Sequence, residues 1–165
     1  MTAAGAKMGA MADRDRDEAG RPRNTRPRDA LGRPLPHGSE GVARIPDDLD
    51  MPPAETLAYA QELLDNGMAF HAHEVFEAAW KNGPHTERSL WQSLAQLAVG
   101  ITHVQRGNTK GALGVLRRAR SGLTDDTSTT HGVDVTGLVD YAGTLIDDLE
   151  AGAQIDPDRL RPRLQ

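Results

Sequence analysis

A histidine and two glutamates between residues 73 and 77 have the types and the spacing of a chemical site. His73 and Glu77 are four residues apart, so one turn of an α-helix would place both side chains on the same stripe. Such a pair either binds one divalent ion or forms a hydrogen bond through which the carboxylate orients the imidazole. Glu74 would lie about 60° around the helix from Glu77, as a supporting group or a solvated one.

His103 is the candidate from a second helix. A weak internal repeat at a shift of 40 residues places His103 opposite Leu63, in a row that otherwise faces inward. Gln96 lies along the same side, two turns earlier. Because a buried polar group without a partner costs about 1–3 kcal/mol, we expect His103, His73 and Glu77 to converge in space.

Two interpretations of these residues stay open. In the first, His73, Glu77 and His103 bind a divalent metal, and zinc is the ion that such ligands favour. Glu77 and Glu74 would then be the catalytic carboxylates of a metal-dependent hydrolase, with Glu74 as general base to a metal-bound water. In the second, the same residues form a hydrogen-bond network or ligand contact in a non-enzymatic helical-hairpin module that binds a peptide or small molecule. Trp80, on the same stripe, is either a core residue or part of that site.

Helices must position these residues, because apolar side chains recur at helical spacing and no segment alternates like a strand. The pattern predicts an all-α fold: a bundle of about five helices, built from two helix-turn-helix hairpins plus a C-terminal helix. The expected helices span residues 53–66, 69–81, 86–106, 109–123 and 135–151, with a further turn within 156–164.

Local signals mark the ends of these helices. Gly67 can close the first helix in the left-handed conformation, and Asn108 suits the cap of the fourth. Gly100 lies inside the third helix at a cost of about 1 kcal/mol relative to alanine, which indicates close approach of another helix or a ligand. Four other histidines are expected on the surface or in loops and receive no role: His37, His71, His85 and His131.

The chain divides into an arm and a domain. Residues 1–50 hold five prolines and no aromatic residue, so we expect a largely disordered arm rich in arginine and proline. Within it, the apolar residues of 31–45 could lie extended against the domain. Residues 51–165 are the expected all-helical domain.

Charge and composition narrow the partners. Residues 51–165 carry ten basic and fifteen acidic side chains, so we do not expect this domain to bind nucleic acid. An acidic groove favours a basic partner, or the arginine-rich arm itself. The chain has no cysteine, no run of the ~20 apolar residues that a membrane span needs, and no apolar signal segment. A cytoplasmic location is therefore expected.

The motifs together resemble a bacterial and archaeal family, the domain of unknown function 309. Its pattern is AHExxExxW, then a QxA helix with a histidine, then GNxxGA. The matching segments are Ala72–Trp80, Gln96–His103 and Gly107–Ala112. Members are similar to small all-helical proteins and are often labelled predicted metal-dependent hydrolases. The resemblance implies as site residues His73, Glu74, Glu77, Gln96 and His103. It implies structural roles for Trp80, Asn108, Gly111 and Ala112.

Overall fold

A computed structural model describes residues 27–36, 38–126 and 130–165, and what was expected of residues 1–26 and of His37 lies outside these ranges. The described residues form helices and no strand, which confirms the all-α class. The α-helices are α1 (Pro53–Asp65), α2 (Ala69–Asn82), α3 (Arg88–Gln105), α4 (Thr109–Asp125) and α5 (Val135–Glu150). Two short 3-10 helices are η1 (His85–Glu87) and η2 (Pro157–Leu160).

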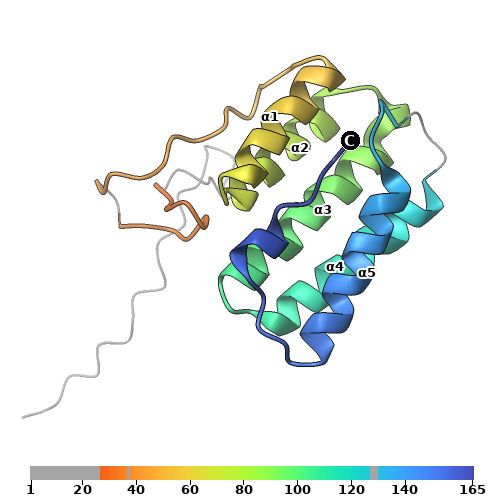
Figure 1. Ribbon diagram of the computed structural model, residues 1–165. Coiled ribbons are helices and arrows are strands. Elements are labelled where there is room, and N and C mark those ends of the chain that lie inside the picture. The colour runs from red at the N-terminus through yellow and green to blue at the C-terminus, as the bar shows by residue number, and fades with distance from the viewer. Residues whose placement is uncertain (1–26, 37, 127–129) are drawn as a thin grey trace, which may run out of the picture.

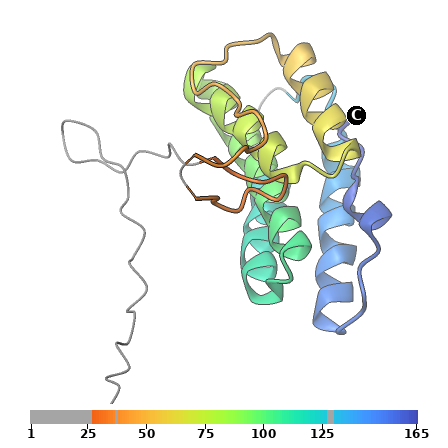
Figure 2. The same ribbon diagram turned by 90° about the vertical axis from the view of Figure 1, so that its left-hand side faces the viewer.

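Each α-helix packs mainly against the next one along the chain, so the bundle is built from successive antiparallel hairpins. Figure 1 shows this order from α1 to α5, and the view in Figure 2 shows α1 and α5 on one side of the bundle. The predicted pairing of two hairpins plus a C-terminal helix is confirmed. The second helix of the first hairpin, α2, packs against the first helix of the next, α3.

The two hairpin turns repeat each other in detail. Gly67 and Gly107 have φ values of 73° and 75°, the left-handed conformation in which glycine avoids a Cβ clash. The amide after each glycine donates to a carbonyl of the preceding helix: Met68 to Leu63, and Asn108 to His103, both at 2.8 Å. The 40-residue repeat is therefore a repeat of local structure.

Helix boundaries follow the local signals closely. The side chain of Asn108 accepts a hydrogen bond from the amide of Gly111 at 3.0 Å, which confirms the predicted cap of α4. The third helix begins at Arg88 rather than at 86, because the chain first forms η1 after Pro84. No helix in the described part of the chain is long and apolar enough to cross a membrane.

A continuous apolar core lies between the five helices. Its largest fully buried side chains include Trp91, Phe76 and Leu116. Gly100 marks a close approach of two helices: a Cβ atom there would lie 2.5 Å from Cδ2 of Leu116 on α4. The expected close contact at Gly100 is thus made by a neighbouring helix.

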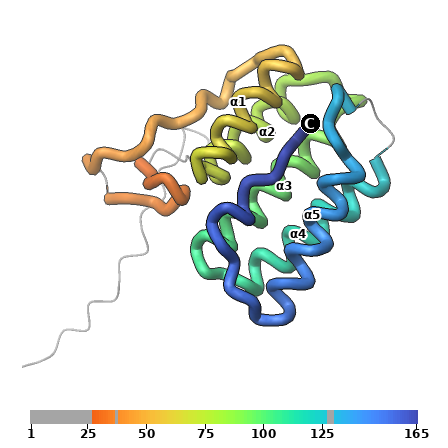
Figure 3. Tube along the Cα trace, in the orientation of Figure 1, coloured from red at the N-terminus to blue at the C-terminus, as the bar shows by residue number. Residues whose placement is uncertain are grey.

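The C-terminal segment closes the bundle after η2. It runs along α1 in the view of Figure 3, and Leu164 is buried there. Gln61 of α1 fixes the segment from both sides, because its side chain donates to the carbonyl of Pro162 at 3.0 Å and accepts from the amide of Leu164 at 2.9 Å.

Candidate functional site

His73 and Glu77 are in direct contact on α2. The distance from His73 Nε2 to Glu77 Oε2 is 3.0 Å. His73 Nδ1 lies 3.1 Å from the carbonyl oxygen of Phe70, one turn earlier. Because one ring nitrogen faces a carbonyl and the other a carboxylate, the helix fixes the orientation of this imidazole.

The His73 hydrogen bond dominates the electrostatics of Glu77. It lowers the pKa of Glu77 to about 2, against the opposing effect of burial, and Lys81 adds to the lowering. Lys81 Nζ lies 2.5 Å from the other carboxylate oxygen of Glu77. Glu77 is therefore a stable anion between two donors.

Glu74, on the same helix, has electrostatic neighbours that differ from those of Glu77. Burial raises its pKa above the ordinary value of 4.5, while His73 and then the positive charges of Arg44 and Arg28 act in the opposite direction. Both arginines belong to the chain before α1. The electrostatic neighbours of Glu74 therefore include residues outside the helical bundle.

The structure does not bring His103 into a group with His73 and Glu77. His103 is half-buried near the end of α3, and its Nδ1 lies 3.2 Å from Nδ2 of Asn108. Burial, together with the charge of Arg106, lowers its pKa. Among residues 27–36, 38–126 and 130–165, no three His, Asp or Glu side chains are arranged to hold a metal ion. Zinc binding itself stays a prediction.

The remaining candidates lie apart from this pair. Gln96 borders a shallow hollow between α3 and α4, together with Arg117 and Arg118. Trp80 is half-buried at the far end of α2, with the Arg88 guanidinium 5.6 Å from its ring centroid.

A turn from the chain before α1 covers the beginning of α2. We call residues 27–36 the arm turn. Asp29 organises it, because its carboxylate accepts hydrogen bonds from the amides of Leu31 at 3.0 Å and Arg33 at 2.8 Å. Arg28 Nη1 donates to the carbonyl of Gly32 at 2.6 Å. The arm turn is therefore a compact structure, and Figure 2 shows it against the helices.

Phe70 is the main contact of the arm turn. The guanidinium groups of Arg28 and Arg106 lie 5.1 and 5.7 Å from its ring centroid, within the range of cation–π attraction. Arg106 Nε also donates to the carbonyl of Leu31 at 2.9 Å. Gly32 is buried with φ 74°, and a Cβ atom there would lie 2.1 Å from Phe70 Cγ.

The arm turn thus lies over Phe70 and Arg106, which stand next to the motif segments, and the charge of its Arg28 acts on Glu74 within them. We call this surface the motif face; it comprises Phe70, His73, Glu74 and Arg106. The Phe70 ring joins the two parts, since its centroid lies 5.2 Å from that of His73 and its other contacts include an arginine and a glycine of the arm. The expectation that residues 31–45 lie against the domain agrees with this contact and with the burial of Ile45.

Two histidines that received no role occupy defined positions. His71 is only 2% exposed, so the expectation of a surface position was wrong. Burial lowers its pKa, and its Nδ1 has no hydrogen-bond partner among the described residues. His131 is bonded to Glu87 rather than solvated, at 2.6 Å from Nε2 to Oε1.

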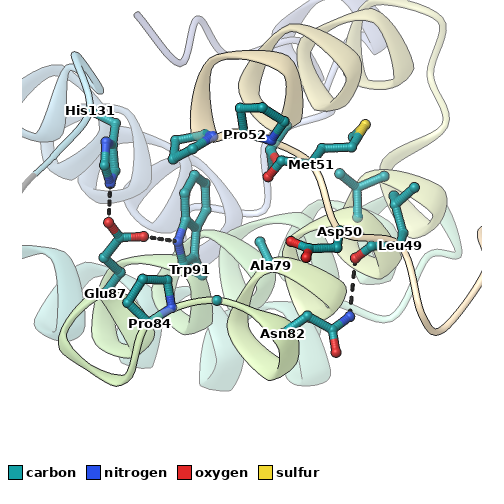
Figure 4. A pocket seen from close by; sticks show the side chains of 14 residues that line it. Leu49, Asp50, Met51, Pro52, Ala79, Asn82, Pro84, Glu87, Trp91 and His131 are labelled. Atoms are coloured by element: carbon teal, nitrogen blue, oxygen red, sulfur yellow. Dashed lines mark hydrogen bonds and ion pairs between the residues drawn. The ribbon is translucent and has the colours of Figure 1, made fainter.

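The Glu87–His131 pair belongs to a second, open region. Trp91 Nε1 donates to the other oxygen of Glu87 at 3.2 Å, and the rings of Trp91 and His131 stack at 6.0 Å. These groups line a cleft of about 580 Å³, which we call the Trp91 cleft (Figure 4). The sequence signal for it was weak, because Glu87 and His131 are 44 residues apart.

Comparison with known proteins agrees with the motif pattern. Residues 57–115 match the model of a family described as Domain of unknown function (DUF309). No curated protein and no solved structure matches the chain. The matched segment contains the whole motif face but ends before His131.

Proposed function

We propose that this chain, which carries a DUF309 domain at residues 57–115, is a binding module whose motif face holds a short arginine-containing polypeptide segment. The arm turn would be its resident occupant. The observation that carries the proposal is the seat of Gly32 on Phe70, where no larger residue fits without displacement. A surface that accepts only glycine at one position selects its bound segment by shape.

The contacts of Arg28 support an arginine as the second residue that the motif face recognises, beside Gly32. Arg28 lies over the face of Phe70, and its charge acts on the half-buried carboxylate of Glu74. Arg106 supplies the third element, since its guanidinium donates to a main-chain carbonyl of the occupant. An aromatic ring, a carboxylate and a main-chain donor together recognise an arginine and a tight turn.

A partner with the same features would compete with the arm turn. The arm is tethered, so its effective concentration at the motif face is high and only a tight-binding partner displaces it. The excess of acidic side chains in residues 51–165 adds a general attraction for basic segments. The module would exchange its own arm turn for a similar segment of a partner protein.

Peptide titration tests this proposal. A fluorescent peptide of residues 27–45 is titrated into the wild-type chain and into Gly32→Ala, whose new Cβ clashes with Phe70. We expect the variant to bind the peptide at least about tenfold more tightly, because its own arm no longer fills the site.

Gly38→Ala is the matched control. Gly38 also has a positive φ, 85°, but no atom lies within 4 Å of the position that a Cβ would take there, so both variants carry backbone strain and only one carries the clash. Gly38→Ala should behave as wild type. Equal peptide binding by all three proteins would refute the occupant role of the arm turn.

Metal-dependent hydrolysis is the second proposal, and the 3.0 Å contact between His73 and Glu77 favours it. Catalytic zinc sites use three protein ligands, and the described residues hold no ready-made group of three. Zinc binding would therefore require a further ligand beside His73 and Glu77.

Metal analysis of tag-free protein separates the two proposals. The binding-module account predicts less than about a tenth of an equivalent of zinc, and no rise in melting temperature on zinc addition. A rise that disappears in both His73→Ala and Glu77→Gln would instead establish a metal site on α2.

A further inference from the structure

The Trp91 cleft lies between the segment that leads into α1 and the end of α2. Its volume of about 580 Å³ falls within the range of small-molecule sites. Met51 and Pro52 form one wall, and Ala79 and Pro84 form the other, with the Trp91 indole between them (Figure 4). The middle of the cleft is thus apolar and fits a hydrocarbon chain.

The acidic groups stand at the two ends of this cleft. Figure 4 shows Glu87 at one end, beside His131, and Asp50 at the other, near Asn82. No lysine or arginine is among the described residues that line it. The lining therefore favours a positively charged ligand over a negatively charged one.

Glu87 is held in place before any ligand arrives. Its side chain is 14% exposed and is fixed by Trp91 and His131, which each engage one carboxylate oxygen. A carboxylate has about four lone-pair sites, so these two bonds leave acceptor capacity on Glu87 unused. Glu87 is a preorganised acceptor rather than a mobile surface charge.

His131 adopts an uncommon backbone conformation at this end of the cleft. Within the described ranges, it is the one residue other than glycine with a positive φ, at 50°. Its side chain stacks on Trp91 and bonds Glu87.

We propose that the Trp91 cleft binds a linear aliphatic polyamine. One ammonium group would bond Glu87, the methylene chain would lie along Trp91 and Ala79, and a second ammonium would meet Asp50. The inference is independent of the peptide proposal, because the arm turn contacts none of these residues in the interactions described above. Tight binding would need both Glu87 and Asp50, one at each end of the cleft.

Fluorescence titration of the full chain tests this site. Putrescine, cadaverine and spermidine are the probes, in a Trp80→Phe background that leaves Trp91 as the reporting indole. We expect saturable binding of at least one diamine, and at least about tenfold weaker binding of butylamine, which has a single ammonium group. Adipate, a dianion of similar length, should not bind.

Matched variants assign the binding to the cleft. Asp50→Asn should reduce diamine affinity to the level of butylamine, while Asp48→Asn, an exposed neighbour outside the cleft lining, should leave it unchanged. Glu87→Gln should weaken every amine, provided its melting curve shows a folded protein. If no amine binds, or if Asp48→Asn and Asp50→Asn weaken binding equally, the proposal is wrong.

Discussion

The motif face and the Trp91 cleft share α2 but differ in how their polar groups are satisfied. On the motif face, Phe70 and Glu74 receive arginines from the chain before α1. In the cleft, Glu87 is bonded by Trp91 and His131, which belong to the bundle itself. The polar and aromatic groups of the motif face thus find partners in a segment outside the bundle. The carboxylate of the Trp91 cleft finds its partners within the bundle, and the cleft itself stays open.

Under the two proposals, this difference separates binding of a polypeptide from binding of a small molecule. A face that needs an arginine and a glycine from another segment selects for a sequence. A cleft whose carboxylate is already fixed selects for charge and length, because only its free acceptor positions are available. Two motif residues, His73 and Glu74, lie on the first surface, and His131, which follows the matched segment, belongs to the second.

Replacement of the two tryptophans gives the largest expected contrast. Trp91 is 2% exposed and stacks between Phe76 and His131, so Trp91→Ala should lower the free energy of unfolding by about 3–5 kcal/mol. Trp80→Ala, which removes a half-buried ring, should cost about 1–2 kcal/mol. Urea denaturation followed by circular dichroism measures both.

Trp91→Phe refines this result. It keeps an aromatic ring between its neighbours but removes the donor to Glu87, so it should cost less than Trp91→Ala. Equal losses of unfolding free energy for Trp91→Ala and Trp80→Ala would contradict the position of Trp91 in the buried core beneath the cleft.

Glu77 gives a smaller, pH-dependent effect on the motif side. Its pKa is about 2 in the folded protein against an ordinary value of 4.5, so its contribution to stability is present above about pH 4.5 and is lost as the pH falls towards 2. Glu77→Gln should lose about 1–2 kcal/mol at pH 6, discounted for partial exposure, and only a small part of that at pH 2.

Urea titrations between pH 2 and 7 measure this difference. Glu62→Gln on α1 is the matched control, because Glu62 is exposed, and its effect should stay within about 0.5 kcal/mol at every pH. A pH-independent loss in Glu77→Gln would show that the His73 contact does not determine the ionisation of Glu77.

Much of the fold could be predicted because its determinants are local. Gly67, Asn108 and Gly100 each act through the turn, cap or helix contact in which they lie. His103, expected in an inward row, is half-buried. Its neighbour Thr102 is fully buried, and the Thr102 hydroxyl is satisfied within the helix by a 2.8 Å bond to the carbonyl of Ala98.

The sites were harder to predict because their partners are distant in sequence. Arg28 meets Phe70 across 42 positions, and no periodicity links an arm arginine to a helix aromatic. The bond between Glu87 and His131 likewise depends on how η1 and the chain before α5 meet in space. The pairing of His73 with Glu77 was predictable, because helical spacing alone produces it.

Amide hydrogen exchange of the arm tests the central claim most directly. The amides of Leu35 and Val42 donate to carbonyls of Pro27 and Arg28, at 2.7 and 2.9 Å, so both depend on an ordered arm turn. We predict exchange at least about tenfold slower than in a free peptide of residues 27–45, with protection lost in Gly32→Ala and kept in Gly38→Ala. Exchange of both amides at the free-peptide rate in the wild-type chain would contradict a docked arm turn.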